Sequence, residues 1–141
     1  MTGHGQRATG SSASALEELL QALVACDEVH LIVKNVGATA ELRGAARLSI
    51  GESWLTIEVV GTPHHLHVRR GALSRAEFLT GGTKNCGVRF LMDEDQAVLA
   101  CYLPGTAEDR PGYSSSRRAA FDRLVARHCG PPSARPSEGG S

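Results

Sequence analysis

The sequence predicts one α+β domain, in which a large, mainly antiparallel β-sheet is flanked by an N-terminal and a C-terminal helix. Three observations carry this prediction. The chain has 141 residues, which suffices for one hydrophobic core but not for two. Apolar residues recur with the 3.6-residue period of a helix near both ends of the chain. Between these ends, short apolar segments follow one another across short turns, as in an antiparallel meander.

The first helix is predicted to begin at Ser14, because Ser14 and Glu17 have the spacing of a capping box. An apolar stripe follows at helical spacing, made of Leu16, Leu19, Leu20, Leu23 and Val24. Residues 1–13 show no such pattern, and the tail 130–141 consists largely of Gly, Pro and Ser. We expect both ends to be disordered and the domain to span residues 14–129.

The middle of the chain is predicted to form strands, because its segments are rich in β-branched residues or alternate between apolar and polar. The segments are 29–33, 38–42, 54–60, 64–70, 74–80, 87–92 and 97–103. A last helix is expected after the loop that follows Pro104, with a cap within 114–116. Its apolar stripe consists of Phe121, Leu124 and Val125.

The composition excludes several classes of function. Lys and Arg number 15 and Asp and Glu also number 15, so the chain lacks the excess of cations that a nucleic-acid binder uses. The longest apolar run, 97–103, is far shorter than the about 20 residues of a membrane span. The N-terminus lacks the apolar stretch of a signal peptide. The four cysteines form no Cys-x-x-Cys pair, which indicates reduced thiols and a cytoplasmic protein.

One local cluster carries candidate chemistry. His64, His65 and His67 lie within four positions and are followed by Arg69. On a strand, His65, His67 and Arg69 share a face, with neighbours about 6.5–7 Å apart. That spacing suits a His-x-His pair on a divalent metal, or an axial imidazole on haem iron with a cation near a propionate. A His-rich strand exposed to solvent, without any ligand, fits the pattern equally well.

A wider resemblance extends this interpretation. The segment 67–78 resembles part of the haem-utilisation proteins of the HutX/ChuX and HemS kind, which carry a His-Leu-Arg-like strand leading towards an aromatic strand. The segment 87–103 is similar to that family's Ser-Val-x-Phe-Phe-Asp-x-x-Gly hairpin and apolar return strand. Upstream, 16–44 is similar to its helix and the strand that follows. The resemblance covers most of residues 15–128.

The resemblance implies a large antiparallel sheet with flanking helices, pairing of two chains, and intracellular haem binding for storage, transfer or reductive breakdown. The family's motif histidine falls on His67, which becomes the candidate axial ligand. His65 or His64 would assist, and Arg69 or Arg89 would lie near the propionates. Neutral imidazole ligates iron, and guanidinium pairs with carboxylates in a forked geometry.

Several functions stay open at this point. We expect a haem-binding protein without catalytic residues of its own. The alternatives are a haem-degrading enzyme that uses an external reductant, a divalent-metal site at His65 and His67, and a dimeric module without ligand. We also expect a homodimer, because an open antiparallel sheet leaves an edge to be paired and two-fold symmetry is the commonest closed arrangement.

Overall fold

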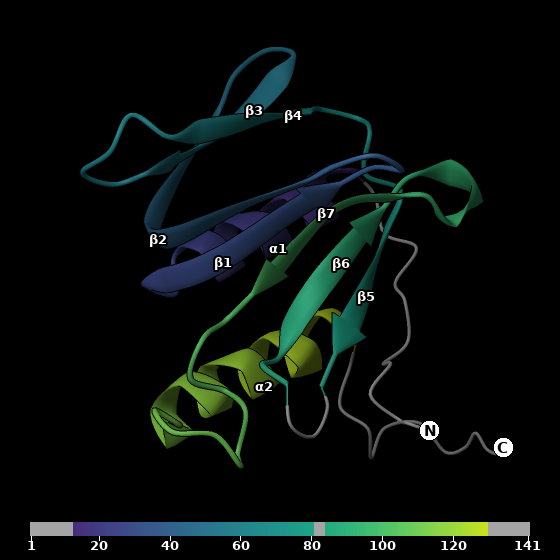
Figure 1. Ribbon diagram of the computed structural model, residues 1–141. Helices are drawn as coiled ribbons and strands as arrows, with labels where there is room; N and C mark the ends of the chain where they lie inside the picture. Colours follow the sequence, from purple (N-terminus) through teal and green to yellow (C-terminus); the bar gives the residue numbers. More distant parts are fainter. Residues whose placement is uncertain (1–12, 81–83, 130–141) are drawn as a thin grey trace, which may run out of the picture.

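The computed structural model describes residues 13–80 and 84–129. Within these residues, two α-helices flank a seven-stranded antiparallel sheet, which confirms the predicted fold class (Figure 1). The helices are α1 (Ala13–Val24) and α2 (Ser115–Cys129). The strands are β1 (Glu28–Lys34), β2 (Thr39–Ile50), β3 (Trp54–Val59), β4 (His65–Arg69), β5 (Arg75–Leu79), β6 (Gly87–Leu91) and β7 (Ala97–Tyr102). The segments expected to be disordered lie outside the described residues, except that Ala13 already belongs to α1.

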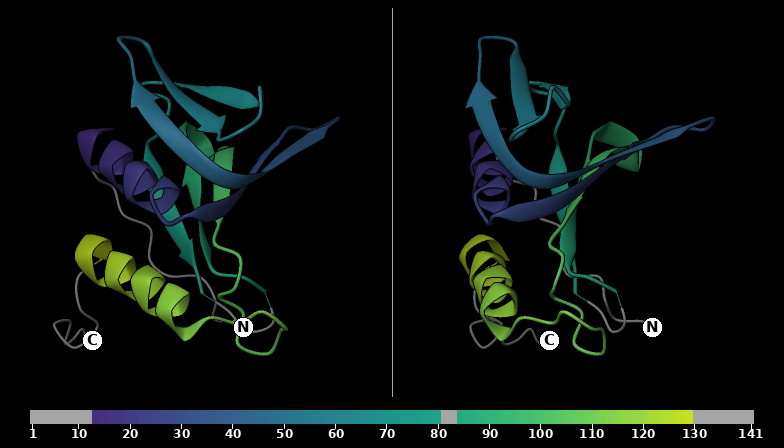
Figure 2. Two further views of the ribbon diagram at one scale, coloured as in Figure 1. Left: turned by 90° about the vertical axis from the view of Figure 1, so that its left-hand side faces the viewer. Right: turned by 60° about the vertical axis from the view of Figure 1, so that its left-hand side comes forward.

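The strand order is β4-β3-β2-β1-β7-β6-β5, so the predicted meander holds only within β1–β4 and within β5–β7. From β4 at one edge the chain passes through residues 70–74 directly to β5 at the other edge, and β7 returns to pair with β1. Such a short link suffices because the sheet is strongly curved, as the course of β2 shows (Figure 2). The expectation of one continuous meander was therefore wrong.

Strand β2 is longer than predicted because it pairs with different neighbours along its length. Its first part pairs with β1 and its last part with β3. Near the end of the part that pairs with β1, Gly44 has a φ of +137°, and a Cβ there would lie 2.9 Å from Val59 Cγ1. Only glycine fits this backbone without strain. Gly44 thus lets one strand serve both parts of the curved sheet.

The hydrophobic core lies between the helices and one face of the sheet, and we call the opposite face the outer face. The apolar stripe predicted for α1 is buried as expected, with every member at most 3% exposed. On α2, Phe121 and Leu124 are buried, whereas Val125 is only half-buried. The strands contribute alternate residues to the same core, among them Val29, Leu31, Leu55, Ile57, Phe78, Val88, Phe90, Leu99 and Cys101. In the described residues, no helix is long and apolar enough to cross a membrane.

The two predicted helix caps turn out differently. On α2 the prediction is confirmed, because the Arg117 N–H donates to Ser114 Oγ at 3.2 Å. On α1 it is wrong, since Ser14 lies inside a helix that begins at Ala13. Glu17 instead accepts hydrogen bonds from Arg70 Nε and Nη2 at 3.0 and 2.9 Å. This forked ion pair joins α1 to the end of β4.

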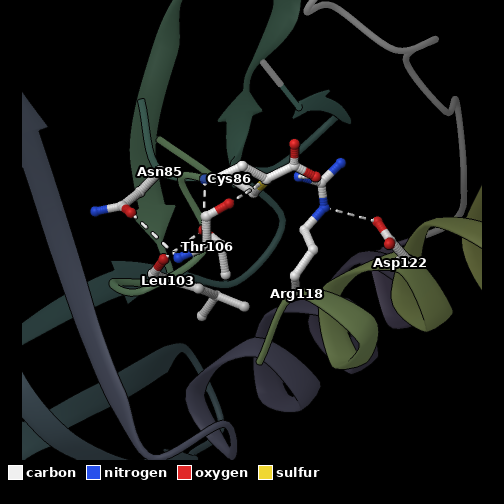
Figure 3. A network of polar contacts seen from close by, with 7 residues as sticks. Asn85, Cys86, Leu103, Thr106, Arg118 and Asp122 are labelled. Atoms are coloured by element: carbon white, nitrogen blue, oxygen red, sulfur yellow. Dashed lines mark hydrogen bonds and ion pairs between the residues drawn. The ribbon is translucent and has the colours of Figure 1, made fainter. Parts of the chain in front are cut away.

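A buried polar cluster joins the start of β6 to the loop after β7 (Figure 3). Thr106 Oγ1 accepts the Cys86 N–H and donates to the Leu103 carbonyl, both at 2.7 Å. The Thr106 N–H donates to Asn85 Oδ1 at 3.3 Å. Burial raises the pKa of the Cys86 thiol and so favours its neutral form. This cluster holds the loop after β7 against the sheet.

Candidate functional site

The candidate site lies on the outer face of β3 and β4, where the register brings polar and aromatic side chains together. Trp54 is paired with Arg69, Thr56 with His67 and Glu58 with His65. Leu55 and Val68, which alternate with these residues, are buried in the core. His65, His67 and Arg69 therefore share the outer face, as the two-residue period of a strand requires.

Aromatic and cationic groups on this face are in contact. The ring centroids of His65 and His67 lie 5.0 Å apart, and those of Trp54 and His67 lie 6.2 Å apart. Arg69 Cζ lies 4.6 Å from the centroid of the Trp54 ring, which is a cation–π contact. We call Trp54, Thr56, His65, His67 and Arg69 the histidine cluster. Its members are exposed apart from Thr56, which is half-buried.

Hydrogen bonds orient both imidazoles of the cluster. His65 Nδ1 lies 3.0 Å from the Pro63 carbonyl oxygen, which can only accept, so Nδ1 carries the proton and Nε2 keeps its lone pair. His67 Nδ1 lies 2.9 Å from Thr56 Oγ1. When His67 donates this bond, its Nε2 is likewise a free acceptor. A histidine that binds a metal usually donates its other N–H to such a partner.

Hollows lie on both sides of the edge strand β4, and His67 lines both of them. The larger one, of about 890 Å³, lies between β4, the tip of the β1–β2 hairpin and the start of β7. We call it the apolar hollow, after Val33, Ala40, Leu42, Leu66, Val68, Ala72, Met92, Ala97 and Val98, which line it. The smaller one, of about 560 Å³, lies beside Trp54, Thr56 and His67. A large flat ligand thus has room at this edge of the sheet.

Two of the predicted ligand residues lie outside the histidine cluster. His64 precedes β4, and its backbone N–H donates to Thr62 Oγ1 at 3.0 Å. Arg89 lies on β6, where it forms an ion pair with Glu77 at 3.1 Å. Neither His64 nor Arg89 lines the hollows beside β4. The structure therefore brings His65, His67 and Arg69 together, but not His64 or Arg89.

Sequence reasoning missed the partners that complete the cluster. The bond from Thr56 to His67 depends on the register of β3 against β4, which no local pattern specifies. Trp54 offered a weak signal, because it is the only tryptophan of the chain and lies on the polar face of its strand. It is 42% exposed, which is unusual for so large an apolar side chain.

A divalent-metal site finds little support in this geometry. Within residues 13–80 and 84–129, no group of three or more His, Cys, Asp or Glu side chains is placed to hold a metal ion. His65 and His67 thus lack a third protein ligand in the described part of the chain. A haem iron needs only one or two protein ligands, because the porphyrin supplies the other four.

Known proteins that are similar to this chain include haem-binding proteins. A family model described as "Haem utilisation ChuX/HutX" matches residues 9–124. No curated protein matches the chain. Among solved structures, "Structure of the Heme Binding Protein ChuX" is similar with a TM-score of 0.69 and 14% identity, over 85% of this chain and 76% of that one.

Longer structures are also similar to this fold. An Escherichia coli haem oxygenase, ChuS, has a TM-score of 0.64 and 19% identity, over 84% of this chain and 36% of that one. Holo-PhuS, a haem-binding protein from Pseudomonas aeruginosa, has a TM-score of 0.60 and 12% identity, over 82% of this chain and 34% of that one. At these identities the likeness concerns the fold.

Proposed function

Because this chain belongs to the haem utilisation ChuX/HutX family, we propose that it binds haem as a cargo for storage or transfer, through the histidine cluster. The observation that carries the proposal is the orientation of His67. Its Nδ1 is bonded to Thr56 at 2.9 Å, and its ring lies 6.2 Å from the exposed ring of Trp54. An imidazole oriented in this way next to an aromatic surface is suited to haem iron and porphyrin.

Each member of the cluster has a role in this proposal. His67 is the axial ligand, and His65 is the assisting imidazole, with its ring 5.0 Å away. Arg69 is held over Trp54 and offers a guanidinium to a propionate. The apolar hollow next to β4 accepts the hydrophobic part of the porphyrin. Haem itself supplies the iron that the imidazole binds.

A haemin titration tests the ligand assignment. We expect the wild type to shift the Soret band of haemin and His67→Ala to lose most of this shift. His65→Ala should weaken binding less, because the imidazole of His67 remains. His64→Ala is the matched control, since His64 neighbours the cluster without belonging to it. An unchanged Soret spectrum in His67→Ala, or an equal loss in His64→Ala, would remove His67 from this role.

Haem degradation is a second candidate, favoured by the structural likeness to the haem oxygenase ChuS. Ligation by one imidazole leaves the other face of the iron open to oxygen, which oxidative chemistry requires. Haem transport and haem degradation predict different effects of a reductant on the bound haem. Loss of the Soret band of bound haem with ascorbate in air, with release of a tetrapyrrole product, identifies an enzyme. A band that survives this treatment identifies a carrier.

We also propose that the protein is a cytoplasmic homodimer. Strand β4 is at an edge of the sheet, next to the exposed apolar side chains of Val33, Val36 and Met92. A second copy would cover such an edge. All four cysteines lie in the described residues and are reduced, the state that the cytosol maintains. A monomeric mass in light scattering at micromolar concentration, with and without haemin, would refute the dimer.

A further inference from the structure

Another hollow lies on the outer face away from β4, and residues of β1, β2, β7 and the loop that follows β7 line it. It has a volume of about 510 Å³, within the range of small-molecule sites, about 300–1,000 Å³. We call it the basic hollow. Its polar lining consists of His30, Arg43, Lys84, Asn85, Tyr102 and Arg110.

The charge of the basic hollow has one sign. Arg43, Lys84 and Arg110 are cationic at neutral pH, and none of the described residues that line the hollow is Asp or Glu. The whole chain, in contrast, has a formal net charge of zero. Among the nearby acids, Glu41 is bonded to His30 at 2.7 Å, and Glu108 forms an ion pair with Arg118 at 3.6 Å. The three cations that line the hollow outnumber these carboxylates, and an excess of positive charge favours an anionic ligand.

The floor of the basic hollow is aromatic. Arg43, His30, Tyr102 and Gly87 are register partners on the neighbouring strands β2, β1, β7 and β6. The rings of His30 and Tyr102 lie 6.3 Å apart. A Cβ at Gly87 would lie 2.6 Å from Tyr102 Cδ1, so the absence of a side chain at Gly87 makes room for the tyrosine ring. These four register partners thus place the rings of His30 and Tyr102 in line with Arg43.

We propose that the basic hollow binds a nucleotide-like phosphate ester. Two or more negative charges would lie at Arg43, Lys84 and Arg110, and a flat ring would lie against Tyr102. Guanidinium binds phosphate through forked hydrogen bonds, and an ammonium group adds a compact point charge. Three cations in one hollow exceed what a single carboxylate needs. The site is separate from the histidine cluster, so its ligand does not depend on haem binding.

Isothermal titration of the full chain with ADP, pyrophosphate and adenosine tests the proposal. We expect ADP to bind most tightly, because it has both the charge and the ring. Arg43→Gln and Lys84→Gln should each weaken the binding of ADP by about 1.4-fold to 5-fold, the range of exposed charge pairs. Tyr102→Leu should weaken ADP but leave pyrophosphate unchanged. Arg47→Gln is the matched control, since Arg47 lies on the same face of β2 but outside the hollow.

Three outcomes would overturn the proposal. The first is the absence of any heat of binding with ADP at millimolar concentration in the wild type. The second is a loss in Arg47→Gln equal to that in Arg43→Gln, which would show general charge attraction. The third is adenosine binding as tightly as ADP, which would exclude the cations as the phosphate contact. Far-UV circular dichroism of each variant verifies that it is folded.

Discussion

Removal of the Thr106 hydroxyl should destabilise the fold more than removal of its methyl group. Thr106 is fully buried, and Thr106→Val replaces the hydroxyl with a methyl of similar volume. The Cys86 N–H and the Leu103 carbonyl would each lose a 2.7 Å partner (Figure 3). An orphaned buried polar group costs about 1–3 kcal/mol, so we expect a loss of about 2–6 kcal/mol for the pair.

Thr106→Ser is the matched control. It keeps the hydroxyl and removes one methyl, which costs about 1 kcal/mol. Urea unfolding followed by far-UV circular dichroism measures both free energies of unfolding. The expected difference is a large part of the about 5–15 kcal/mol that stabilises a typical domain. If Thr106→Val is as stable as Thr106→Ser, the hydroxyl does not hold the loop and the reasoning fails.

Three further predictions concern the same fold. Glu17→Gln should lower the melting temperature, because it weakens the forked bond to Arg70. Glu18→Gln, at an exposed neighbouring position, should leave the melting temperature unchanged. Equal melting temperatures of the two variants would contradict this prediction. Burial raises the pKa of Cys101 from 9.0 to about 12, so this thiol should stay unlabelled by Ellman's reagent at pH 8 until urea unfolds the protein. Burial and Arg127 lower the pKa of His128 from 6.5, so the folded state favours the neutral imidazole and loses stability on acidification. His128→Gln should therefore flatten the dependence of the free energy of unfolding in urea on pH between pH 7 and 5. An unchanged slope would refute the assignment.

Local patterns predicted the parts of this fold that depend on neighbours in the sequence. The leucine stripe of α1 and the facing of His65 and His67 follow directly from the periods of a helix and a strand. The bend at Gly44 and the pairing of β1 with β7 depend on contacts between distant segments, which periodicity does not report. The same holds for Glu17, whose spacing from Ser14 imitates a cap while its carboxylate binds Arg70.

The candidate site shows the same division. The imidazoles and the arginine were found because they lie close together on one strand. Thr56, which orients His67, and Trp54, which contacts Arg69, lie on the neighbouring strand and become visible only through the register. The basic hollow had no sequence signal, because Arg43, Lys84 and Arg110 come from separate segments.

The strand order also bears on how the chain reaches its folded state. Strands β1–β4 form one group and strands β5–β7 another, and within each group the strands that pair are neighbours in the sequence, so each group can form early through short loops. The pairing of Leu31 with Cys101 joins the groups and closes a long stretch of chain. Contacts so distant in sequence slow folding, so the docking of β7 on β1 should be the late, rate-limiting event. A substitution at the β1–β7 contact that leaves the hairpins intact should therefore increase the unfolding rate strongly. It should have little effect on the early formation of either group of strands.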